Sequence, residues 1–367
     1  MKKVLFLTNY PSPYRVRFFD ELANYADVTV LFADRKEKQK HRNADWYIRG
    51  EGRFRAVQLQ KHVAAFGRFD LCTDVLPWLK QGFDEIVVCG YSNPTMILAM
   101  LYMRLNRIPF CMEVDGGLIR ADRKLKYFVK KRLVCLADRW LSTGRWTTKY
   151  LVHYGAKQEN ITEYPFSSLS EKDILSQPVS REEKNALRKA LGISEDHMIL
   201  AIGQFIHRKG FDVLLHAAQA LDDRTGVYIV GGEATEEYKT LREELGVKNV
   251  HFLGFQPKEH LANFYKAADL FVLPTREDIW GLVINEAMAY GLPTITTDRC
   301  VAGLELITEG VNGSIVPVGD EKLLAEKIQT VLASDMDAMG AAALAAVRPY
   351  TLENMAKVHG DYFENGR

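Results

Sequence analysis

The sequence has few cysteines, and they are not arranged to crosslink the chain or bind zinc. Its 367 residues include five cysteines, an odd number, and no two of them form a Cys-x-x-Cys pair. A disulfide framework and a zinc-finger spacing are therefore excluded as the basis of the fold. We expect the cysteines to be small buried side chains in a reducing compartment.

Long hydrophobic runs are missing as well. The longest ones, such as residues 4–7 and 270–273, have the length of a strand and not the roughly 20 residues that span a bilayer. Met1-Lys2-Lys3 leads into too short an apolar run for a secretory signal peptide. With 47% hydrophobic and 26% charged residues, the composition is that of a globular protein and not of a disordered or fibrous one. We therefore expect a cytoplasmic protein of two domains.

The formal net charge of +1 hides an uneven distribution. Residues 1–165 hold 28 Lys and Arg against 17 Asp and Glu, whereas the remainder holds 20 against 30. Such a basic front half favours an anionic surface or ligand. Nucleic acid is not the expected partner, because no nucleic-acid-binding motif is present and the cations are not interleaved with stacking aromatic residues.

Strand and helix patterns alternate along the chain, which predicts an α/β fold. In the front half, strands are expected at residues 4–8, 28–32, 54–59, 85–89, 109–114 and 140–142. After a polar stretch, a second series is expected at residues 198–203, 227–231, 250–253, 270–274 and 294–297. We predict two tandem Rossmann-like, doubly wound domains facing a central cleft, at residues 1–165 and 166–349. The closing helix, about residues 350–367, is expected to pack back on the first domain.

The most informative segment is residues 270–297, where a strand, a charged loop and a helix follow one another. The helix is expected to begin near Gly281 and to end at Gly291, with Pro293 just beyond it. Its N-terminus then lies at the carboxyl end of a parallel strand, where free N–H groups can bind a diphosphate. The candidate groups are the backbone N–H groups of Trp280, Gly281, Leu282 and Val283.

Charged side chains accompany this helix. Asp278 and Glu286 can accept hydrogen bonds from sugar or ribose hydroxyls; the alternative for Glu286 is a solvated helix carboxylate. Arg208 and Lys209 follow the strand at residues 198–203 and can pair with a diphosphate, unless they are only a solvated pair.

Together these two segments resemble the retaining glycosyltransferases of family 4, which have the GT-B fold. The signature E-x7-E followed by G-x-P corresponds here to Asp278-x7-Glu286 and then Gly291-Leu292-Pro293. The signature G-R-x-x-x-x-K-G corresponds to residues 203–210, in which Gln204 stands where an arginine is usual. Asp278 in place of glutamate is the second departure from the family pattern.

The resemblance implies roles for individual residues. Lys209 would contact the donor diphosphate, Glu286 the ribose hydroxyls and Asp278 the hydroxyls of the donor sugar. Phe255 would line the base pocket, and Arg208 would compensate for Gln204. The co-substrate would be a nucleotide diphosphate sugar, for which we expect UDP. No other cofactor is expected, and no metal is needed if Lys209 and the helix N–H groups neutralise the diphosphate.

The acceptor side is expected in the front half. Residues 11–15 resemble the P-S-P-Y-R opening of family members in polysaccharide assembly, and Arg15 either meets a phosphate or begins a helix. Glu113 and Asp115 are candidates to orient or deprotonate an acceptor hydroxyl; the alternative is an ordinary turn. Asp335-Met336-Asp337 is interpreted as a helix cap and not as a metal site.

A basic amphipathic helix is expected within residues 120–136. Leu125, Phe128, Val129, Leu133 and Leu136 share one face, and seven basic residues surround it. We expect this helix to lie on an anionic membrane, at the inner face of the cell membrane; the alternative is that its apolar stripe packs on the sheet.

These observations favour a retaining, metal-independent glycosyltransferase. It would move a hexose-type sugar to a hydroxyl acceptor, which we expect to be a lipid-linked glycan intermediate of cell-surface polysaccharide synthesis. Two alternatives stay open. One is a nucleotide-sugar epimerase or hydrolase on the same fold, and the other is a non-catalytic sugar-nucleotide- or membrane-binding partner of another transferase.

Overall fold

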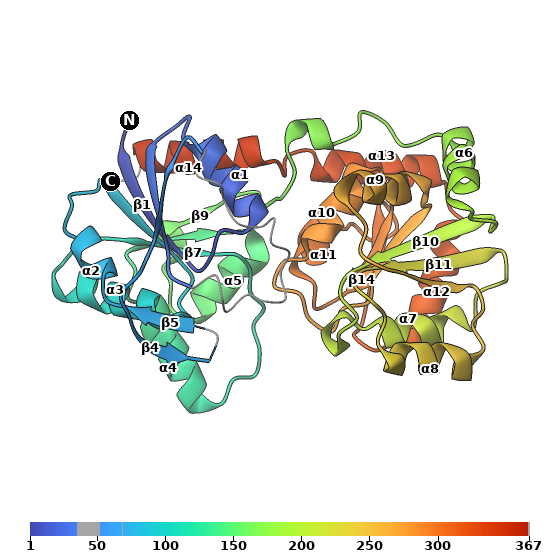
Figure 1. The fold of residues 1–367 in the computed structure, drawn as a ribbon, viewed down its shortest axis with the longest axis horizontal. Coiled ribbons are helices and arrows are strands. Elements are labelled where there is room, and N and C mark those ends of the chain that lie inside the picture. Colours follow the sequence, from blue (N-terminus) through green and yellow to red (C-terminus); the bar gives the residue numbers. More distant parts are fainter. Residues whose placement is uncertain (35–51, 68, 366–367) are drawn as a thin grey trace. The chain divides into compact units, whose positions relative to one another are not determined.

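The chain consists of two compact units (Figure 1). The computed structural model describes residues 1–34, 52–67 and 69–365. Unit 1 comprises Met1–Ser168 and Tyr350–Arg367, and unit 2 comprises Leu169–Pro349. The C-terminal helix α14 (Leu352–Asn365) belongs to unit 1, where it packs against α1 (Pro13–Leu22). The last two residues of the helix predicted at 350–367 lie outside the described residues.

Unit 1 is built on a parallel sheet with strand order β3-β2-β1-β6-β7-β8-β9. These strands are β1 (Lys3–Thr8), β2 (Asp27–Phe32), β3 (Arg55–Gln58), β6 (Glu85–Cys89), β7 (Cys111–Val114), β8 (Arg139–Ser142) and β9 (Ile161–Glu163). Its other helices are α2 (Val75–Trp78), α3 (Pro94–Leu105), α4 (Lys124–Val134), α5 (Arg145–His153) and the 3-10 turn η3 (Gln158–Asn160). An antiparallel hairpin, β4 (His62–Phe66) with β5 (Phe69–Cys72), forms a separate small sheet that the sequence reading missed.

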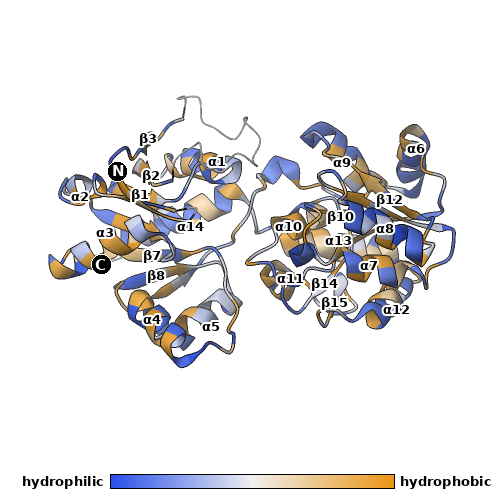
Figure 2. Cartoon of the chain, turned by 60° about the horizontal axis from the view of Figure 1, so that its bottom comes forward, coloured by the Kyte–Doolittle hydropathy of each residue, from blue (hydrophilic) through white to orange (hydrophobic). Residues whose placement is uncertain are grey.

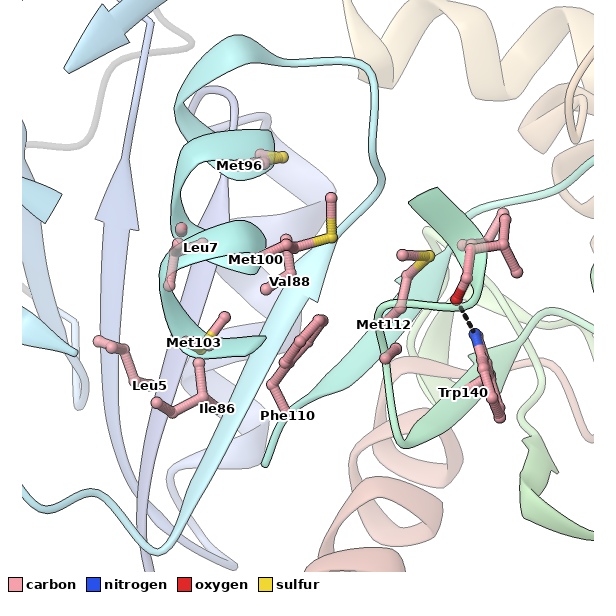
Figure 3. Packing of buried hydrophobic residues seen from close by; sticks show 14 of the residues in the cluster. Leu5, Leu7, Ile86, Val88, Met96, Met100, Met103, Phe110, Met112 and Trp140 are labelled. Carbon is pink, nitrogen blue, oxygen red and sulfur yellow. Dashed lines mark hydrogen bonds between the residues drawn. The ribbon is translucent and has the colours of Figure 1, made fainter. Parts of the chain in front are cut away.

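The core of unit 1 forms where α3 covers the sheet (Figure 3). Asn93 caps this helix by accepting a hydrogen bond from the Thr95 N–H, and Pro94 occupies its first turn. The buried side chains of Met96, Met100 and Met103 then pack on residues of the strands. The strand residues drawn there are Leu5 and Leu7 of β1 and Ile86 and Val88 of β6.

Unit 2 has a parallel sheet with strand order β12-β11-β10-β13-β14-β15. The strands are β10 (His197–Ile202), β11 (Thr225–Val230), β12 (Val250–Leu253), β13 (Leu270–Leu273), β14 (Thr294–Thr297) and β15 (Gly313–Val316). The longer helices are α6 (Arg181–Leu191), α7 (Phe211–Ala218), α8 (Glu236–Leu245), α9 (Lys258–Ala267), α10 (Leu282–Ala289), α12 (Glu321–Leu332) and α13 (Met336–Val347). The shorter elements are α11 (Val301–Leu306), η4 (Glu171–Asp173) and η5 (His207–Lys209).

Both sheets are doubly wound, which confirms the predicted α/β class. In each unit the strand order reverses once, between β1 and β6 in unit 1 and between β10 and β13 in unit 2. Ligands of such sheets bind beyond the carboxyl ends of the strands at this switch point. The residues that follow β1, β6, β10 and β13 are therefore where a site is sought.

Two smaller expectations also meet the structure. Asp335 caps α13, since its Oδ1 accepts a hydrogen bond from the Ala338 N–H at 3.0 Å, as predicted for a helix cap. The expectation of buried cysteines holds for Cys72, Cys111 and Cys300, but Cys89 is only half-buried, and Cys135, at the C-terminal cap of α4, is exposed.

Within the described residues, no single helix has the length and hydropathy to cross a membrane. One bent pair, Glu321–Leu332 with Met336–Asn365, passes that test only when both parts are taken together across a 106° bend.

Candidate functional site

Two cations and one carboxylate meet at the switch point of unit 2. The loop after β10 forms the turn η5, which carries Arg208 and Lys209, and the loop after β13 carries Asp278. Lys209 Nζ lies 2.7 Å from Asp278 Oδ2, and the Arg208 guanidinium lies 3.3 Å from the same oxygen. The sequence prediction placed all three residues in the site, but it did not foresee that Asp278 binds the two cations.

The two loops are held together by further contacts. The backbone N–H of Arg276 donates to the Arg208 carbonyl at 2.8 Å, and the Arg276 guanidinium is paired with Asp212 of α7 at 2.5 Å. Gly210, at φ +69°, packs so closely that a Cβ atom there would lie 2.1 Å from the Pro274 carbonyl oxygen. Only glycine fits this position, so the loops keep a fixed spacing. Sequence reasoning missed Arg276 and Asp212.

Helix α10 begins at the same edge of the sheet. Gly281 caps this helix with its backbone in the left-handed region, at φ 101°, a conformation that residues with a side chain rarely adopt. Because α10 begins at Leu282, the backbone N–H groups of Leu282 and Val283 belong to its first turn, where N–H groups have no partner within the helix. Trp280 is 3% exposed, and its indole N–H donates to Asn285 at 2.8 Å, which braces the start of the helix.

Glu286 lies one turn into α10 and is half-buried. Tyr265 of α9 donates its hydroxyl to Glu286 Oε2 at 3.0 Å and stacks on Tyr290. Burial raises the pKa of Tyr265 well above its ordinary value, and Glu286 adds to the shift. The simple solvated carboxylate is therefore excluded, because a buried phenol orients Glu286. No sequence signal pointed to Tyr265.

Two predicted donor-site residues have exposed side chains. Gln204 follows β10, and Phe255 follows β12 with 70% of its surface exposed. Both lie beyond carboxyl ends of strands. An exposed phenyl ring at such an edge offers a face on which a planar group can stack.

In unit 1 the structure corrects the roles predicted for Arg15 and Glu113. Arg15, on α1, is 3% exposed, and Glu113, on β7, is fully buried. The guanidinium holds the carboxylate with two bonds, of 2.9 and 2.6 Å, and also contacts the Cys89 thiol at 3.0 Å. Burial opposes the charge of Glu113, but Arg15 and then His359 hold its pKa well below its usual range. Arg15 is thus not available to a phosphate, and Glu113 is not available as a base.

Asp115 lies at the edge of this buried cluster. Its Oδ1 is buried without a hydrogen-bond partner, 3.8 Å from Arg15, although the side chain as a whole is 40% exposed. Burial of the carboxyl group raises the pKa of Asp115 to about 6; Arg15 opposes this shift and Glu113 adds to it. The partly exposed side chain, at the carboxyl end of β7, keeps the access that a base requires.

Helix α4 carries the predicted basic amphipathic segment. Leu125, Phe128 and Val129 are 76%, 52% and 47% exposed, and basic side chains lie among them, so orange and blue alternate along the helix in Figure 2. Leu133 and Leu136 are only half-buried. The alternative that the whole stripe packs on the sheet therefore fails for its first two turns.

In the part of the chain that the structure describes, no group of three or more His, Cys, Asp or Glu side chains is placed to hold a metal ion.

Comparisons with known proteins bear on the family and the fold of the chain. Residues 183–344 match the family model of glycosyl transferases group 1. D-inositol 3-phosphate glycosyltransferase of Geodermatophilus obscurus is 30% identical over 233 residues, which cover 58% of this chain and 50% of that protein. The chain thus spans about half the length of the curated relatives it matches.

Solved structures match over almost the whole chain. HepE of Anabaena, in complex with UDP, gives a TM-score of 0.77 at 18% identity over 99% of both chains. Sucrose-phosphate synthase of Thermosynechococcus elongatus gives 0.74 at 21% identity over 99% of this chain and 98% of that one. The chain therefore has the parallel-sheet α/β fold of GT-B glycosyltransferases, and within it residues 183–344 match the glycosyl transferases of group 1.

Proposed function

We propose that this chain is a retaining glycosyltransferase that moves a hexose-type sugar from a nucleotide diphosphate sugar to a hydroxyl acceptor. One observation carries the proposal. Arg208, Lys209 and the start of α10 meet at the switch point of unit 2, the place where a doubly wound sheet binds its ligand. Cations beside a helix N-terminus suit a diphosphate.

In the ligand-free chain, Asp278 is the counter-ion of both cations. A diphosphate carries more negative charge than one carboxylate and offers several acceptor oxygens, so it can replace Asp278 as the partner of Arg208 and Lys209. Asp278 Oδ1 takes part in neither ion pair. We assign this oxygen to a hydroxyl of the donor sugar.

The donor is a nucleotide sugar with UDP as the proposed nucleotide, since UDP and UDP-glucose are bound in the structures of HepE. Glu286, whose carboxylate is oriented by Tyr265, accepts hydrogen bonds from the ribose hydroxyls. Phe255 supplies an exposed ring for the base. Gln204 adds a neutral polar group beside the diphosphate.

The chemical step depends mainly on stabilising the leaving group. As the bond between the anomeric carbon and the diphosphate oxygen breaks, negative charge grows on the diphosphate. Arg208, Lys209 and the N–H groups of α10 stabilise it there. The acceptor hydroxyl attacks the same face, which retains the anomeric configuration, and its proton passes to the departing phosphate. These groups supply the neutralisation that a metal would, so we propose metal-independent transfer.

Unit 1 supplies the acceptor side. Of the carboxylates predicted there, only Asp115 is accessible, and we assign it to orient the acceptor hydroxyl. The proposed acceptor is a lipid-linked glycan intermediate of cell-surface polysaccharide synthesis. This choice is supported by α4, whose exposed apolar residues and surrounding cations suit an anionic lipid surface. The protein would then be peripheral on the cytoplasmic face of the cell membrane.

The donor site is tested by thermal shift with a panel of nucleotides and nucleotide sugars. Wild type should be stabilised most by one nucleotide sugar. Lys209→Met, which keeps the alkyl chain but removes the charge, should lose that shift. Lys322→Met, the same change at an exposed lysine of α12, serves as the matched control. If no nucleotide or nucleotide sugar raises the melting temperature of the wild type, the proposal of a donor site is wrong.

Turnover separates the remaining functions. Release of free sugar without an acceptor would indicate a hydrolase. Donor binding without turnover over a broad acceptor panel would indicate a non-catalytic binding protein. Activity that survives EDTA is expected for metal-independent transfer, and activity that EDTA abolishes contradicts it.

The membrane surface is tested by sedimentation with vesicles. Wild type should bind vesicles containing phosphatidylglycerol more strongly than vesicles of phosphatidylcholine alone, and added salt should weaken the binding. Phe128→Ser should reduce binding, whereas Val311→Ser, with an equally exposed residue on unit 2, should not. Equal binding by all three proteins would contradict the role of α4.

A further inference from the structure

A buried histidine on the C-terminal helix contacts the acceptor-side cluster. His359, on α14, is fully buried, and its Nε2 lies 3.4 Å from Glu113 Oε1. The sequence reading assigned no role to this residue. The chain places it 246 positions after Glu113, and α14 brings it back into unit 1 beside α1.

Both ring nitrogens of His359 face acceptors. Nδ1 lies 2.8 Å from the Met355 carbonyl oxygen, and Nε2 faces the Glu113 carboxylate. A neutral imidazole carries one N–H and one lone pair, so one of these two contacts would bring a lone pair toward an oxygen. The imidazolium, with two N–H groups, directs a donor at each acceptor: Nδ1–H bonds the Met355 carbonyl, and Nε2–H faces Glu113 in an ion pair at 3.4 Å that lacks hydrogen-bond geometry.

The charges of the cluster then balance. Arg15 and His359 are positive, and Glu113 and Asp115 are negative. Other polar groups face the cluster from each packed element: Cys89 at the end of β6, Tyr14 of α1 and Tyr164 after β9. Burial raises the pKa of the Tyr164 hydroxyl well above its ordinary value, so it adds no charge.

We propose that His359 is a positioning residue of the acceptor side: as an imidazolium it holds Glu113, and through Glu113 it keeps Arg15 directed at Asp115. The importance of this for catalysis rests on the role proposed above for Asp115. The positive charge proposed for His359 does not depend on that role, because it is a property of the ligand-free chain.

The consequence for Asp115 follows from charge. Arg15 and His359 both favour its ionised form, whereas burial and Glu113 oppose it. Removing the charge of His359 should therefore raise the pKa of Asp115 above the present value of about 6. We expect a rise of about one unit.

Two variants separate the charge from the packing of the ring. His359 packs edge-on against Phe18 and Tyr164, with ring centroids 4.8 and 4.6 Å apart. His359→Phe keeps these aromatic contacts but removes both N–H groups and the charge. His359→Gln keeps an N–H donor for Glu113 but removes the charge.

The test is NMR on the ligand-free protein. Nitrogen shifts should show two N–H groups on the His359 ring at pH 7, and a neutral ring would overturn the proposal. A carbon-detected titration should give a higher pKa for Asp115 in both variants than in wild type. An unchanged Asp115 titration in a folded His359→Phe protein would also overturn it.

Activity adds a readout that distinguishes the two proposals. If transfer is found, the acidic limb of the kcat–pH profile should move to higher pH in both variants, while the affinity for the donor stays unchanged. If the wild-type protein transfers no sugar, the proposed function is refuted, but the NMR result for His359 is unaffected. If the pKa of Asp115 shifts in the variants but the acidic limb of their kcat–pH profile does not, the link from His359 to catalysis is overturned.

Discussion

Breaking the buried pair between Arg15 and Glu113 should destabilise unit 1 strongly. Arg15→Met removes the guanidinium but keeps an unbranched apolar side chain against Phe18 and Phe19, whose rings Arg15 now covers at 5.2 and 4.9 Å. Glu113 then keeps only His359, at 3.4 Å, as a charged partner. Removing one partner of a buried pair costs about 3–5 kcal/mol, and two lost bonds place this site in the upper half of that range.

The second arm of the cycle is Glu113→Gln, which leaves Arg15 with Asp115 as its remaining charged partner, at 3.8 Å. This change should cost about 3 kcal/mol. The double variant should cost about as much as the more severe single variant, because the second substitution removes a group already left without its partner.

The assay is urea unfolding followed through Trp140, which is buried in unit 1 and donates its indole N–H to the Val134 carbonyl at 3.2 Å (Figure 3). The expected coupling energy is about 3 kcal/mol. Additive effects, with coupling below about 0.5 kcal/mol, would refute the claim that these two side chains form one buried unit.

Three further predictions concern the donor site and the acidic edge of unit 1. Glu286→Gln should weaken binding of the donor by about 10-fold or more in calorimetry, because it removes a charged acceptor but keeps an oxygen for Tyr265; unchanged affinity would contradict the ribose contact. Gly210→Ala should lower the stability of unit 2 by at least about 2 kcal/mol, since its Cβ would meet the Pro274 carbonyl at 2.1 Å; an unchanged urea midpoint would show that the loops do not keep this spacing. Asp115→Asn should stabilise the fold at pH 8 but not at pH 4. The pKa of Asp115 is raised to about 6 in the folded protein, against about 3.9 in the unfolded chain. The protonated carboxyl group therefore stabilises the wild-type fold below about pH 4, and this stabilisation is lost as the pH rises through 6. With 40% of the side chain exposed, screening reduces this gain to about 1 kcal/mol, and an equal gain at both pH values would contradict the shift.

Most of the fold could be predicted from the sequence because parallel sheets bury their strands on both faces. The continuous apolar runs within β1, β10 and β13 therefore predict strands, and capped helices such as α6 have clear ends. The hairpin β4–β5 was missed because its strands are short and their residues are mostly exposed or half-buried. Short β9 was missed for the same reason, and β15 was missed because only Ile315 and Val316 of its four residues are apolar side chains of strand type.

The donor side was predictable because its residues are close in sequence to the ends of β10 and β13. Lys209 and Glu286 stand on local strand–loop–helix patterns that a sequence displays. Their partners do not, because Tyr265 reaches Glu286 from another helix.

The acceptor side shows the opposite case. Arg15 and Glu113 have the residue types of a site, yet 98 positions apart they neutralise each other in the core. No local pattern reveals such a pairing. Asp115 keeps its predicted place because it lies two residues farther on, past the end of β7.

The central claim is transfer of sugar from a nucleotide diphosphate to a hydroxyl. The most direct measurement incubates the chain with a nucleotide sugar and a membrane lipid extract, and follows both nucleoside diphosphate and glycosylated lipid by mass spectrometry. We expect the two products to appear in equal amounts with wild type and both to be lost with Lys209→Met. Nucleoside diphosphate released with free sugar and no glycosylated lipid, or a donor bound and never consumed, would contradict it.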